Sequence, residues 1–227
     1  NKEQCIKYRL EEYTVNIFIF GGNGQIGKRL VDRLLEDGKH TVTVGLRKEE
    51  QFPYFEKKEA KPVLVNLEDT VDSIAGKLKN MDAVVFTAGS GGGTGADKTL
   101  LIDLDGAIKT IEAAEQADVD HYVMVSAFGA GDRSTWNEEI KPYYVAKYYA
   151  DQALESSSLN YTIIRPGALT NEPGKGTVSF DNQDDFHISR DDVASVIAEV
   201  IGRENAFRKA FNLLPGNVPV KELAENI

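Results

Sequence analysis

The sequence is poor in the residues that form disulfides and metal sites. Its single cysteine, Cys5, has no second thiol in the chain to pair with, which favours a reducing, cytoplasmic location. The three histidines, His40, His121 and His187, are scattered and form no cluster with ligand spacing, so we expect no bound metal.

Long apolar runs and an excess of positive charge are also missing. No apolar run approaches the roughly 18 residues that a membrane-spanning helix requires, so we expect no membrane association. Acidic residues number 36 and basic residues 26, which gives a formal net charge of −10. The chain has no stripe of Lys and Arg, on which nucleic-acid recognition depends, so we expect no nucleic-acid partner.

Near its start the sequence does contain an apolar strand, a glycine-punctuated turn and an amphipathic helix. Residues 15–27 read V-N-I-F-I-F-G-G-N-G-Q-I-G, and a helical pattern follows. A dinucleotide-binding βαβ unit requires this order, with glycines for the tight bend, for the approach of a pyrophosphate and for close helix–strand packing. The N–H groups at the helix N-terminus would bind the phosphates. We expect the cofactor to contact this phosphate loop, which consists of Gly21, Gly22, Asn23, Gly24, Gln25, Ile26 and Gly27.

The same residues nearly match the phosphate-binding loop of an NTPase, and an ordinary βα turn is a further alternative. Gly22, Gly27 and Lys28 have the NTPase spacing, but Arg29 follows where Mg²⁺ coordination needs a Ser or Thr hydroxyl. Lys28 also falls inside the helical pattern. The dinucleotide-binding interpretation is therefore favoured.

Strand-like apolar runs alternate with helical patterns along the chain, which is typical of a parallel sheet covered by helices on both faces. We expect strands over 15–20, 41–46, 62–65, 83–87, 122–126, 161–165 and 210–214. We expect helices over about 25–36, 70–79, 97–117, 138–157 and 190–203, with a short one after Pro219. The prediction is a single-domain, doubly wound α/β Rossmann fold over residues 14–227. An arm, residues 1–13, precedes it and is either disordered or a partner contact.

A glycine-rich segment, residues 89–95, directly follows the fourth expected strand. Ligands of doubly wound sheets bind at the carboxyl ends of the strands, so this segment is expected to border the cofactor, with a solvated linker as the alternative. Ala88, Gly89 and Ser90 are therefore expected cofactor-binding residues.

The end of the second expected strand bears on the choice of dinucleotide. Folds that prefer NAD place Asp or Glu there, whereas this strand ends in Leu46, Arg47 and Lys48, with no carboxylate before Glu49. A guanidinium at this point can grip the 2′-phosphate of NADP, and Lys48 or Lys28 could assist. We expect NADP rather than NAD, and the alternative is that Arg47 is a solvated surface residue.

Tyr143 and Lys147 form a Tyr-x-x-x-Lys pattern in the helix after the fifth strand, and their spacing places both side chains on one helical face. We expect Lys147 to lower the pKa of Tyr143 and make this tyrosine a usable acid or base, because a neighbouring ammonium favours the phenolate. Lys147 could also hold the nicotinamide ribose. Ser126, at the end of the fifth strand, could hydrogen-bond a substrate carbonyl. In the alternative interpretation the tyrosines around Tyr143 only coat the sheet.

The sequence resembles the short-chain dehydrogenase/reductase superfamily in four features: the phosphate loop, Arg47, the Tyr-Lys pair and the segment Y-T-I-I-R-P-G over residues 161–167. These features most resemble its atypical NAD(P)H-binding branch, near the NAD-dependent epimerase/dehydratase-like and biliverdin-reductase-B-like proteins. The resemblance implies a sheet in the order 3-2-1-4-5-6-7, with NADP across its carboxyl edge. It also implies that Pro166 and Gly167 pass beside the nicotinamide, and that Asn66 and Leu67 lie near the adenine.

The chain departs from the family pattern in three respects. Asn66 replaces the usual Asp, which keeps a hydrogen-bonding group but loses the charge. The catalytic serine of the superfamily commonly stands one or two residues beyond Ser126, where this chain has Ala127 and Phe128. The long C-terminal extension with which extended members hold nucleotide sugars is missing, which disfavours a sugar-nucleotide epimerase or dehydratase.

The resulting hypothesis is an NADP(H)-dependent oxidoreductase that acts, as a monomer or homodimer, on a small carbonyl, quinone-like, flavin or tetrapyrrole acceptor. Tyr143 would donate the proton, Ser126 would polarise the acceptor, and the loops 127–137 and 168–187 would shape the pocket. The alternative is a non-catalytic NADP(H)-binding redox sensor, which the imperfect serine position motivates.

Overall fold

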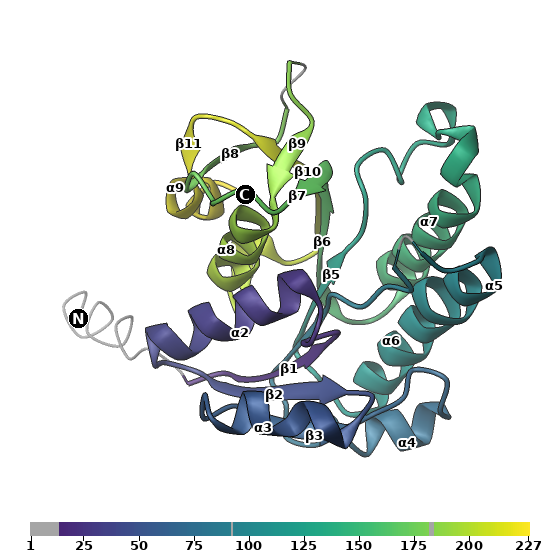
Figure 1. Cartoon of the computed structure of the whole chain (residues 1–227), viewed down its shortest axis with the longest axis vertical. Helices are drawn as coiled ribbons and strands as arrows, with labels where there is room; N and C mark the ends of the chain where they lie inside the picture. The colour runs from purple at the N-terminus through teal and green to yellow at the C-terminus, as the bar shows by residue number, and fades with distance from the viewer. Residues whose placement is uncertain (1–13, 92, 182–183) are drawn as a thin grey trace, which may run out of the picture.

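A mostly parallel sheet runs through the computed structural model, which describes residues 14–91, 93–181 and 184–227 (Figure 1). The predicted N-terminal arm, residues 1–13, lies outside the described residues. In the described part the sheet has nine strands, in the order β11-β8-β10-β6-β5-β4-β1-β2-β3. Its parallel strands are β1 (Asn16–Phe20), β2 (Thr41–Leu46), β3 (Lys61–Leu64), β4 (Ala83–Phe86), β5 (His121–Val125), β6 (Asn160–Pro166) and β10 (Lys209–Pro215).

The parallel strands confirm the predicted Rossmann fold. They pair in the order 3-2-1-4-5-6-7, with β10 as the seventh strand. Four short strands have no counterpart in the prediction, because two or three residues are too few to show an alternating pattern. β8 (Thr177–Ser179) and β11 (Val218–Pro219) extend the sheet in antiparallel fashion beyond β10, and β7 (Ala168–Thr170) and β9 (His187–Ser189) form a separate pair.

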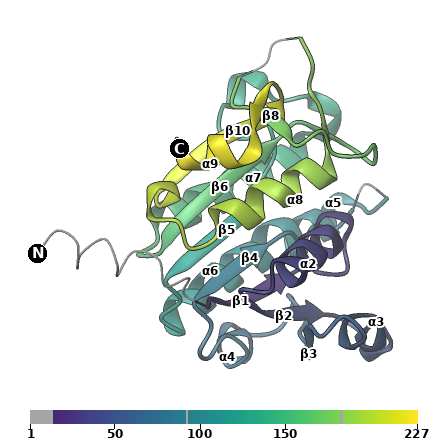
Figure 2. The same cartoon turned by 90° about the vertical axis from the view of Figure 1, so that its left-hand side faces the viewer.

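Helices connect the strands and cover both faces of the sheet (Figures 1 and 2). The helices of the described residues are α2 (Gln25–Asp37), α3 (Phe52–Glu56), α4 (Val71–Ala75), α5 (Ala96–Lys98), α6 (Ala107–Gln116), α7 (Lys141–Ser156), α8 (Arg190–Val200) and α9 (Val220–Glu225). A π-helical segment, η2 (Thr99–Gly106), joins α5 to α6. The 3-10 turns are η1 (Glu49–Gln51), η3 (Arg133–Thr135), η4 (Glu138–Ile140) and η5 (Glu204–Ala206).

Two apolar layers fix the sheet between these helices. Successive side chains of β1 point to opposite faces, so Ile17 and Ile19 are buried on one face and Phe18 and Phe20 on the other. The isoleucine face belongs to a core that includes α2, α8 and α9, and the phenylalanine face to one that includes α4, α6 and α7. Because both faces are packed, the loops at the carboxyl edge start from rigid strand ends.

Several helix boundaries differ from the predicted ones. The stretch 97–117 is helical, but its middle is the π-helical η2. α7 begins at Lys141 rather than at 138, because Pro142 fits only the first turn of a helix. The helix predicted to run to 79 ends at Ala75, after which hydrogen bonds between residues three apart continue as turns.

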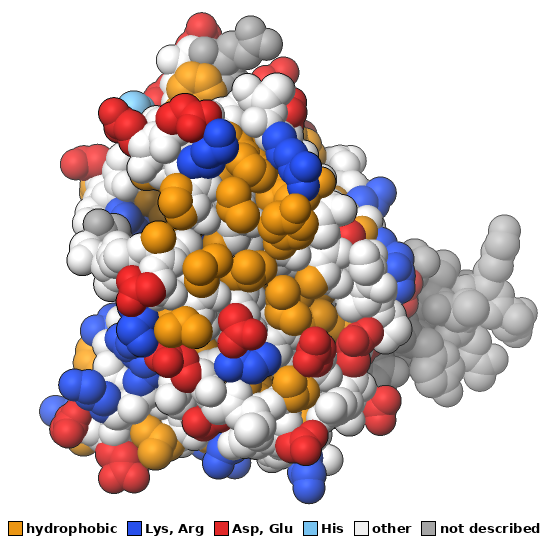
Figure 3. All heavy atoms as spheres, turned by 90° about the vertical axis from the view of Figure 1, so that its right-hand side faces the viewer, with side chains coloured by type: hydrophobic (Ala, Val, Ile, Leu, Met, Phe, Trp, Pro, Cys, Tyr) orange, Lys and Arg blue, Asp and Glu red, His pale blue; other side chains and the backbone are white. Residues whose placement is uncertain are grey.

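Two properties of the outer surface bear on possible partners. Hydrophobic side chains gather on the face that carries α5, α6 and α7 (Figure 3). The exposed apolar residues of η2, which joins α5 to α6, and of α7 include Leu100, Leu101 and Tyr149. In the described ranges, no helix combines the length and the apolar character needed to cross a bilayer.

Candidate functional site

The phosphate loop joins β1 to α2 at the carboxyl edge of the sheet. Gly21 has φ +78°, in the left-handed region, and its carbonyl accepts a hydrogen bond from Gly24 N at 2.8 Å. A Cβ at Gly27 would lie 2.4 Å from Gly21 O, and one at Gly21 would lie 2.5 Å from Ala88 N. The obstructing atoms belong to the backbone, so a side chain at either position would displace the loop.

The N-terminus of α2 is open to a ligand. Gly24 is its N-cap and makes no side-chain capping bond, and the first turn contains no acidic residue. The first N–H groups of a helix have no intrahelical partner and carry partial positive charge, so the loop and helix form a cradle that fits a pyrophosphate. Asn23 and Gln25 are exposed at this cradle, whereas Gly22, Ile26 and Gly27 are buried beneath it.

Two adjacent cavities extend along the carboxyl edge from this cradle. The first, of about 230 Å³, borders the ends of β1 and β2, and the second, of about 680 Å³, borders the end of β5. Ala88, Gly89 and Ser90 line both, so a dinucleotide can extend from one cavity into the other. The predicted cofactor residues that line the first cavity are Gly21, Asn23, Gly24, Arg47, Leu67, Ala88, Gly89 and Ser90.

Arg47 stands at the end of β2 and lines the first cavity. It is exposed and makes no ion pair with any residue that the structure describes. Lys48 does not line this cavity and serves as the N-cap of η1. Gln51, which no sequence pattern identifies, does line it. Among the described residues its buried Oε1 has no hydrogen-bond partner, which makes it a candidate acceptor for a ligand hydroxyl.

Asn66 and Leu67 follow β3, and the structure separates them. Leu67 is buried and lines the first cavity, whereas Asn66 is exposed and does not line it. Asn66 Oδ1 accepts a hydrogen bond from Glu68 N at 3.1 Å, which shapes the turn after the strand. Asn66 therefore shapes this turn, and its predicted contact with the adenine stays a prediction.

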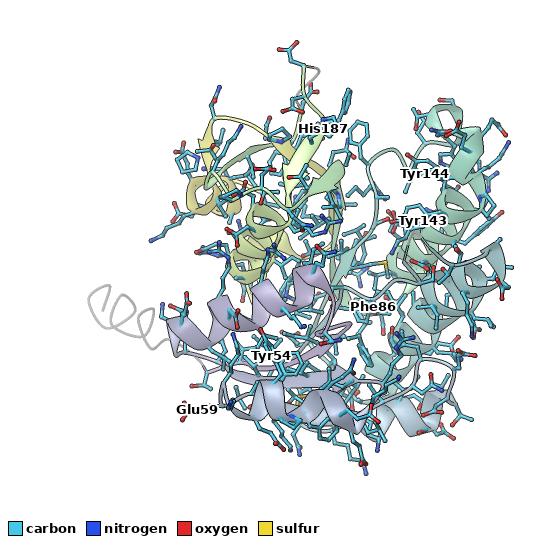
Figure 4. The ribbon with its side chains drawn as sticks, viewed as in Figure 1. Tyr54, Glu59, Phe86, Tyr143, Tyr144 and His187 are labelled. Atoms are coloured by element: carbon cyan, nitrogen blue, oxygen red, sulfur yellow. The ribbon has the colours of Figure 1, made fainter. Side chains whose placement is uncertain are left out.

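The second cavity brings Ser126, Tyr143 and Lys147 together. Ser126 directly follows β5, and the other two lie one turn apart on α7, where Figure 4 shows Tyr143 beside Tyr144. Lys147 Nζ lies 5.7 Å from the centre of the Tyr143 ring. The three predicted catalytic residues thus share one cavity, which adjoins the cofactor groove.

Lys147 is buried, and its ammonium is held from two sides. Nζ donates a hydrogen bond to Val125 O at 3.1 Å and lies 3.7 Å from Asp103 Oδ1. The other oxygen of Asp103 accepts a hydrogen bond from Ser90 N at 2.9 Å, so this carboxylate connects the glycine-rich segment to Lys147. Sequence reasoning missed Asp103. Its signal in the sequence is an acidic residue inside the apolar run L-L-I-D-L. In the structure this run lies in a π-helical segment, and such segments are frequent at functional sites.

The prediction of a lowered pKa for Tyr143 is wrong, although Lys147 acts in the predicted direction. Burial raises the pKa of the Tyr143 phenol, Lys147 opposes this rise without cancelling it, and Asp103 adds to it. A free tyrosine already titrates near pH 10, so this phenol is protonated at neutral pH. The arrangement suits a proton donor rather than a base.

A charged network lies behind Ser126. Asp151, only 1% exposed, accepts a hydrogen bond from Arg165 Nε at 2.8 Å, and Arg165 also bonds Glu155. Burial raises the pKa of Asp151 although Arg165 and the nearby Ser126 hydroxyl oppose the rise. Ser126 Oγ is buried and makes no hydrogen bond of regular geometry with a described residue. A hydroxyl in this condition is available to a ligand in the cavity.

Pro166 and Gly167 lie at the carboxyl end of β6 but line neither cavity. Pro166 O accepts a hydrogen bond from Phe128 N at 2.8 Å. A Cβ at Gly167 would lie 2.2 Å from Phe186 O, so packing explains the glycine. Leu169, further along the same segment, does line the second cavity.

The tyrosines next to Tyr143 do not coat the sheet. Tyr144 stacks on Trp136 with ring centres 6.2 Å apart, and Tyr148 meets the same indole edge-on at 5.6 Å. The Arg133 guanidinium lies 4.5 Å from the centre of the Tyr148 ring. These contacts attach the loop 127–137 to α7, beside the second cavity.

The histidines lie away from both cavities. His121 is buried at the start of β5, where its ring bonds Thr162 and Gly202, and the exposed side chain of His187 pairs with Asp185. His40 accepts a hydrogen bond from Val15 N. In the described part of the chain, no group of three or more His, Cys, Asp or Glu residues could hold a metal ion.

A Rossmann sheet with a glycine cradle, an open helix N-terminus and a groove along its carboxyl edge defines a dinucleotide-binding protein. A family model described as NAD(P)H-binding matches residues 21–204. The chain belongs to this NAD(P)H-binding family, whose members bind a nicotinamide cofactor.

Similarity to individual proteins extends over nearly the whole chain. It is 50% identical over 215 residues to Bacillus subtilis (strain 168) YhfK, named an uncharacterized sugar epimerase, and the match covers 94% of this chain and 100% of YhfK. A Bacillus halodurans structure named for the NAD-dependent epimerases/dehydratases has a TM-score of 0.87 at 40% identity, over 94% of this chain and 100% of that one. The oxidoreductase YlbE from Lactococcus lactis has a TM-score of 0.85 at 32% identity, over 93% and 96%. The predicted resemblance to NAD(P)H-binding proteins of the NAD-dependent epimerase/dehydratase type is confirmed.

Proposed function

We propose that this protein is an NADPH-dependent reductase of a small carbonyl, quinone-like, flavin or tetrapyrrole acceptor. One observation carries the proposal: a protonated phenol (Tyr143), a buried ammonium (Lys147) and a serine hydroxyl (Ser126) line one cavity that adjoins the phosphate cradle. The cavity of about 680 Å³ is within the range of small-molecule sites, so the nicotinamide and an acceptor can share it.

The cofactor would lie along the groove with its pyrophosphate at the N-terminus of α2. Arg47 would bind the 2′-phosphate of NADP, because it lines the first cavity and no described carboxylate neutralises it. Gln51 Oε1 is placed to accept a hydrogen bond from an adenosine ribose hydroxyl. When bound, the reduced nicotinamide supplies a hydride.

The protein side chains would supply the proton. Tyr143 donates its phenolic proton to the acceptor atom that becomes basic as the hydride arrives. This atom is the oxygen of a carbonyl or quinone, or a ring nitrogen of a flavin or tetrapyrrole, and Ser126 donates a hydrogen bond to the same atom. Lys147 stabilises the phenolate that remains, and Val125 O and Asp103 hold this ammonium in place. Water then returns a proton to the phenolate, so the acceptor has gained one hydride and one proton.

The test is NADPH oxidation, followed by absorbance, with a panel of carbonyl, quinone, flavin and tetrapyrrole acceptors. Tyr143→Phe should reduce kcat by about 10²-fold or more and leave NADPH affinity nearly unchanged, because general-acid catalysis contributes about 10²–10⁴-fold. Tyr144→Phe is the matched control, since the neighbouring ring stacks on Trp136 and does not line the cavity. Equal activity of wild type and Tyr143→Phe would remove Tyr143 from the mechanism. Tight NADPH binding without oxidation of any acceptor would favour the redox sensor.

The cofactor preference has a separate test. Arg47→Glu should weaken NADPH binding by about 30-fold more than NADH binding, because a charge-assisted contact contributes about 1.5–3 kcal/mol. Lys48→Glu makes the same charge change one residue away, outside the first cavity, and should change the ratio much less. An NADPH-to-NADH ratio unchanged by Arg47→Glu would show that the 2′-phosphate is bound elsewhere.

A further inference from the structure

Few of the described residues that line the second cavity are charged, and the one cation among them, Lys147, is buried. The charged lining residues are Asp103, Glu139 and Lys147. Lys147 Nζ is already bonded to Val125 O and paired with Asp103. The positive charge of Lys147 is therefore already compensated by groups of the protein. Because Glu139 adds a second carboxylate, the charged residues of the lining have a net negative charge.

The rest of the lining of this cavity combines apolar side chains with the hydroxyl groups of Ser90, Thr94, Thr99, Ser126 and Tyr143. Ile140, Pro142 and Leu169 line it beside the Tyr143 ring. Ile140 is 46% exposed, a high value for a large aliphatic side chain, so its apolar surface is available to a bound molecule. These three side chains offer van der Waals contact and no hydrogen bonds, which suits the flat apolar part of a bound molecule.

Each described basic residue that is next to the lining in sequence, or in contact with it, has a partner within the protein. Lys98 pairs with Glu68 at 3.0 Å and Lys141 pairs with Glu138 at 2.8 Å. Arg190, beside Leu169, donates to the carbonyl of that residue and to Asn171 Oδ1, each at 3.2 Å. An anionic group of a substrate would thus lose water without gaining a cation, and would face the Glu139 carboxylate.

We propose that the substrate of this site is a flat, apolar electrophile without negative charge, such as a neutral quinone. The proposal rests on the reductase function proposed above and narrows it, because flavin phosphates and tetrapyrrole carboxylates carry negative charge. It also separates the site from one that holds a sugar nucleotide, because the diphosphate of a sugar nucleotide is negatively charged. The specificity determinant is Glu139, which repels anions at the mouth, together with the apolar side chains beside it.

The test compares three anthraquinones of similar size that differ in charge: a neutral sulfonamide, an anionic sulfonate and a cationic trimethylammonium derivative. Their dissociation constants with the NADP⁺-loaded protein are measured by calorimetry, and NADPH oxidation is followed with each compound. The sulfonamide and the cation should bind at least about tenfold more tightly than the sulfonate, because the Glu139 carboxylate repels a negative charge.

Glu139→Lys should raise sulfonate affinity and remove most of this preference. Glu138→Lys is the matched control: Glu138 is an exposed neighbour that pairs with Lys141 and does not line the cavity, so it should leave the preference nearly unchanged. Equal binding of the three compounds to the wild type, or tighter binding of a nucleotide sugar than of the sulfonamide, would overturn the proposal. The two hypotheses fail separately. A charge preference in binding without NADPH oxidation supports this inference and removes the reductase, whereas equal rates of NADPH oxidation with all three compounds support the reductase and overturn this inference.

Discussion

Replacing Asp103 by Asn tests whether the buried carboxylate compensates Lys147. In the wild type the side chains of Asp103 and Lys147 are 2% and 4% exposed, and their charged atoms lie 3.7 Å apart. The substitution keeps the volume and an acceptor for Ser90 N but removes the negative charge. The ammonium of Lys147 would then be buried with only the carbonyl of Val125 as a partner.

The expected cost follows from this geometry. Breaking a buried ion pair by removing one partner costs about 3–5 kcal/mol, because an uncompensated charge is left in a poorly solvated position. The separation of 3.7 Å and the retained Val125 O bond place this case near the lower end, at about 3 kcal/mol. For a protein of this size each kcal/mol lowers Tm by about 2–4 °C, so Tm should fall by about 6–12 °C.

Urea and thermal unfolding measure this loss of stability. Two further variants test whether the loss comes from the unpaired charge of Lys147. Asp105→Asn is the matched control, because Asp105 is 55% exposed in an ion pair with Lys109 on the surface and should cost less than about 1 kcal/mol. Asp103→Asn combined with Lys147→Met removes both charges and should be more stable than Asp103→Asn alone. If Asp103→Asn were as stable as Asp105→Asn, the carboxylate would not compensate Lys147, and its role in holding the ammonium would be refuted.

Two further predictions concern acid stability and the phosphate loop. Burial lowers the pKa of His121 from 6.5 to about 4, so between these values the unfolded chain binds a proton that the folded protein does not. The free energy of unfolding is therefore unaffected by His121 above pH 6.5 and falls by about 3 kcal/mol as the pH drops to 4. His121→Gln should make the free energy of unfolding depend less on pH over this range. An unaltered pH dependence would contradict this prediction. Gly27→Ala should weaken NADPH binding by about 10–100-fold in a direct titration, since its Cβ would overlap the backbone of the loop, whereas Gly76→Ala, with its nearest contact at 3.4 Å, should bind normally. Normal binding by Gly27→Ala would show that the loop can yield.

The fold and the cofactor groove were predictable because they depend on short-range patterns. Successive side chains of a strand point to opposite faces of the sheet, as Ile17 to Phe20 do. The order of strands and helices along the chain can be read directly from the sequence. The glycines of the phosphate loop mark positions where the backbone itself leaves no room for a Cβ. Arg47 is identified by its position after a strand, and parallel strands end at one edge of the sheet.

The site chemistry was less predictable because it depends on what packs around each group. The Tyr143–Lys147 spacing suggests a lowered phenol pKa, but burial of the ring outweighs the ammonium. Asn66 occupies a position associated with adenine, yet its amide oxygen is used by the following turn. Asp103 is distant in sequence from Lys147 and reaches it only because η2 packs against α7.

By itself, the sequence determined the Rossmann topology, the glycine cradle and the meeting of Ser126, Tyr143 and Lys147 at one sheet edge. The reason is that these features follow from residue periodicity, backbone sterics and strand order. Only the tertiary structure decided the protonation of Tyr143, the pairing of Lys147 with Asp103 and the acidic character of the second cavity. Solvation and charge compensation depend on distances between residues far apart in the chain, which local patterns do not contain.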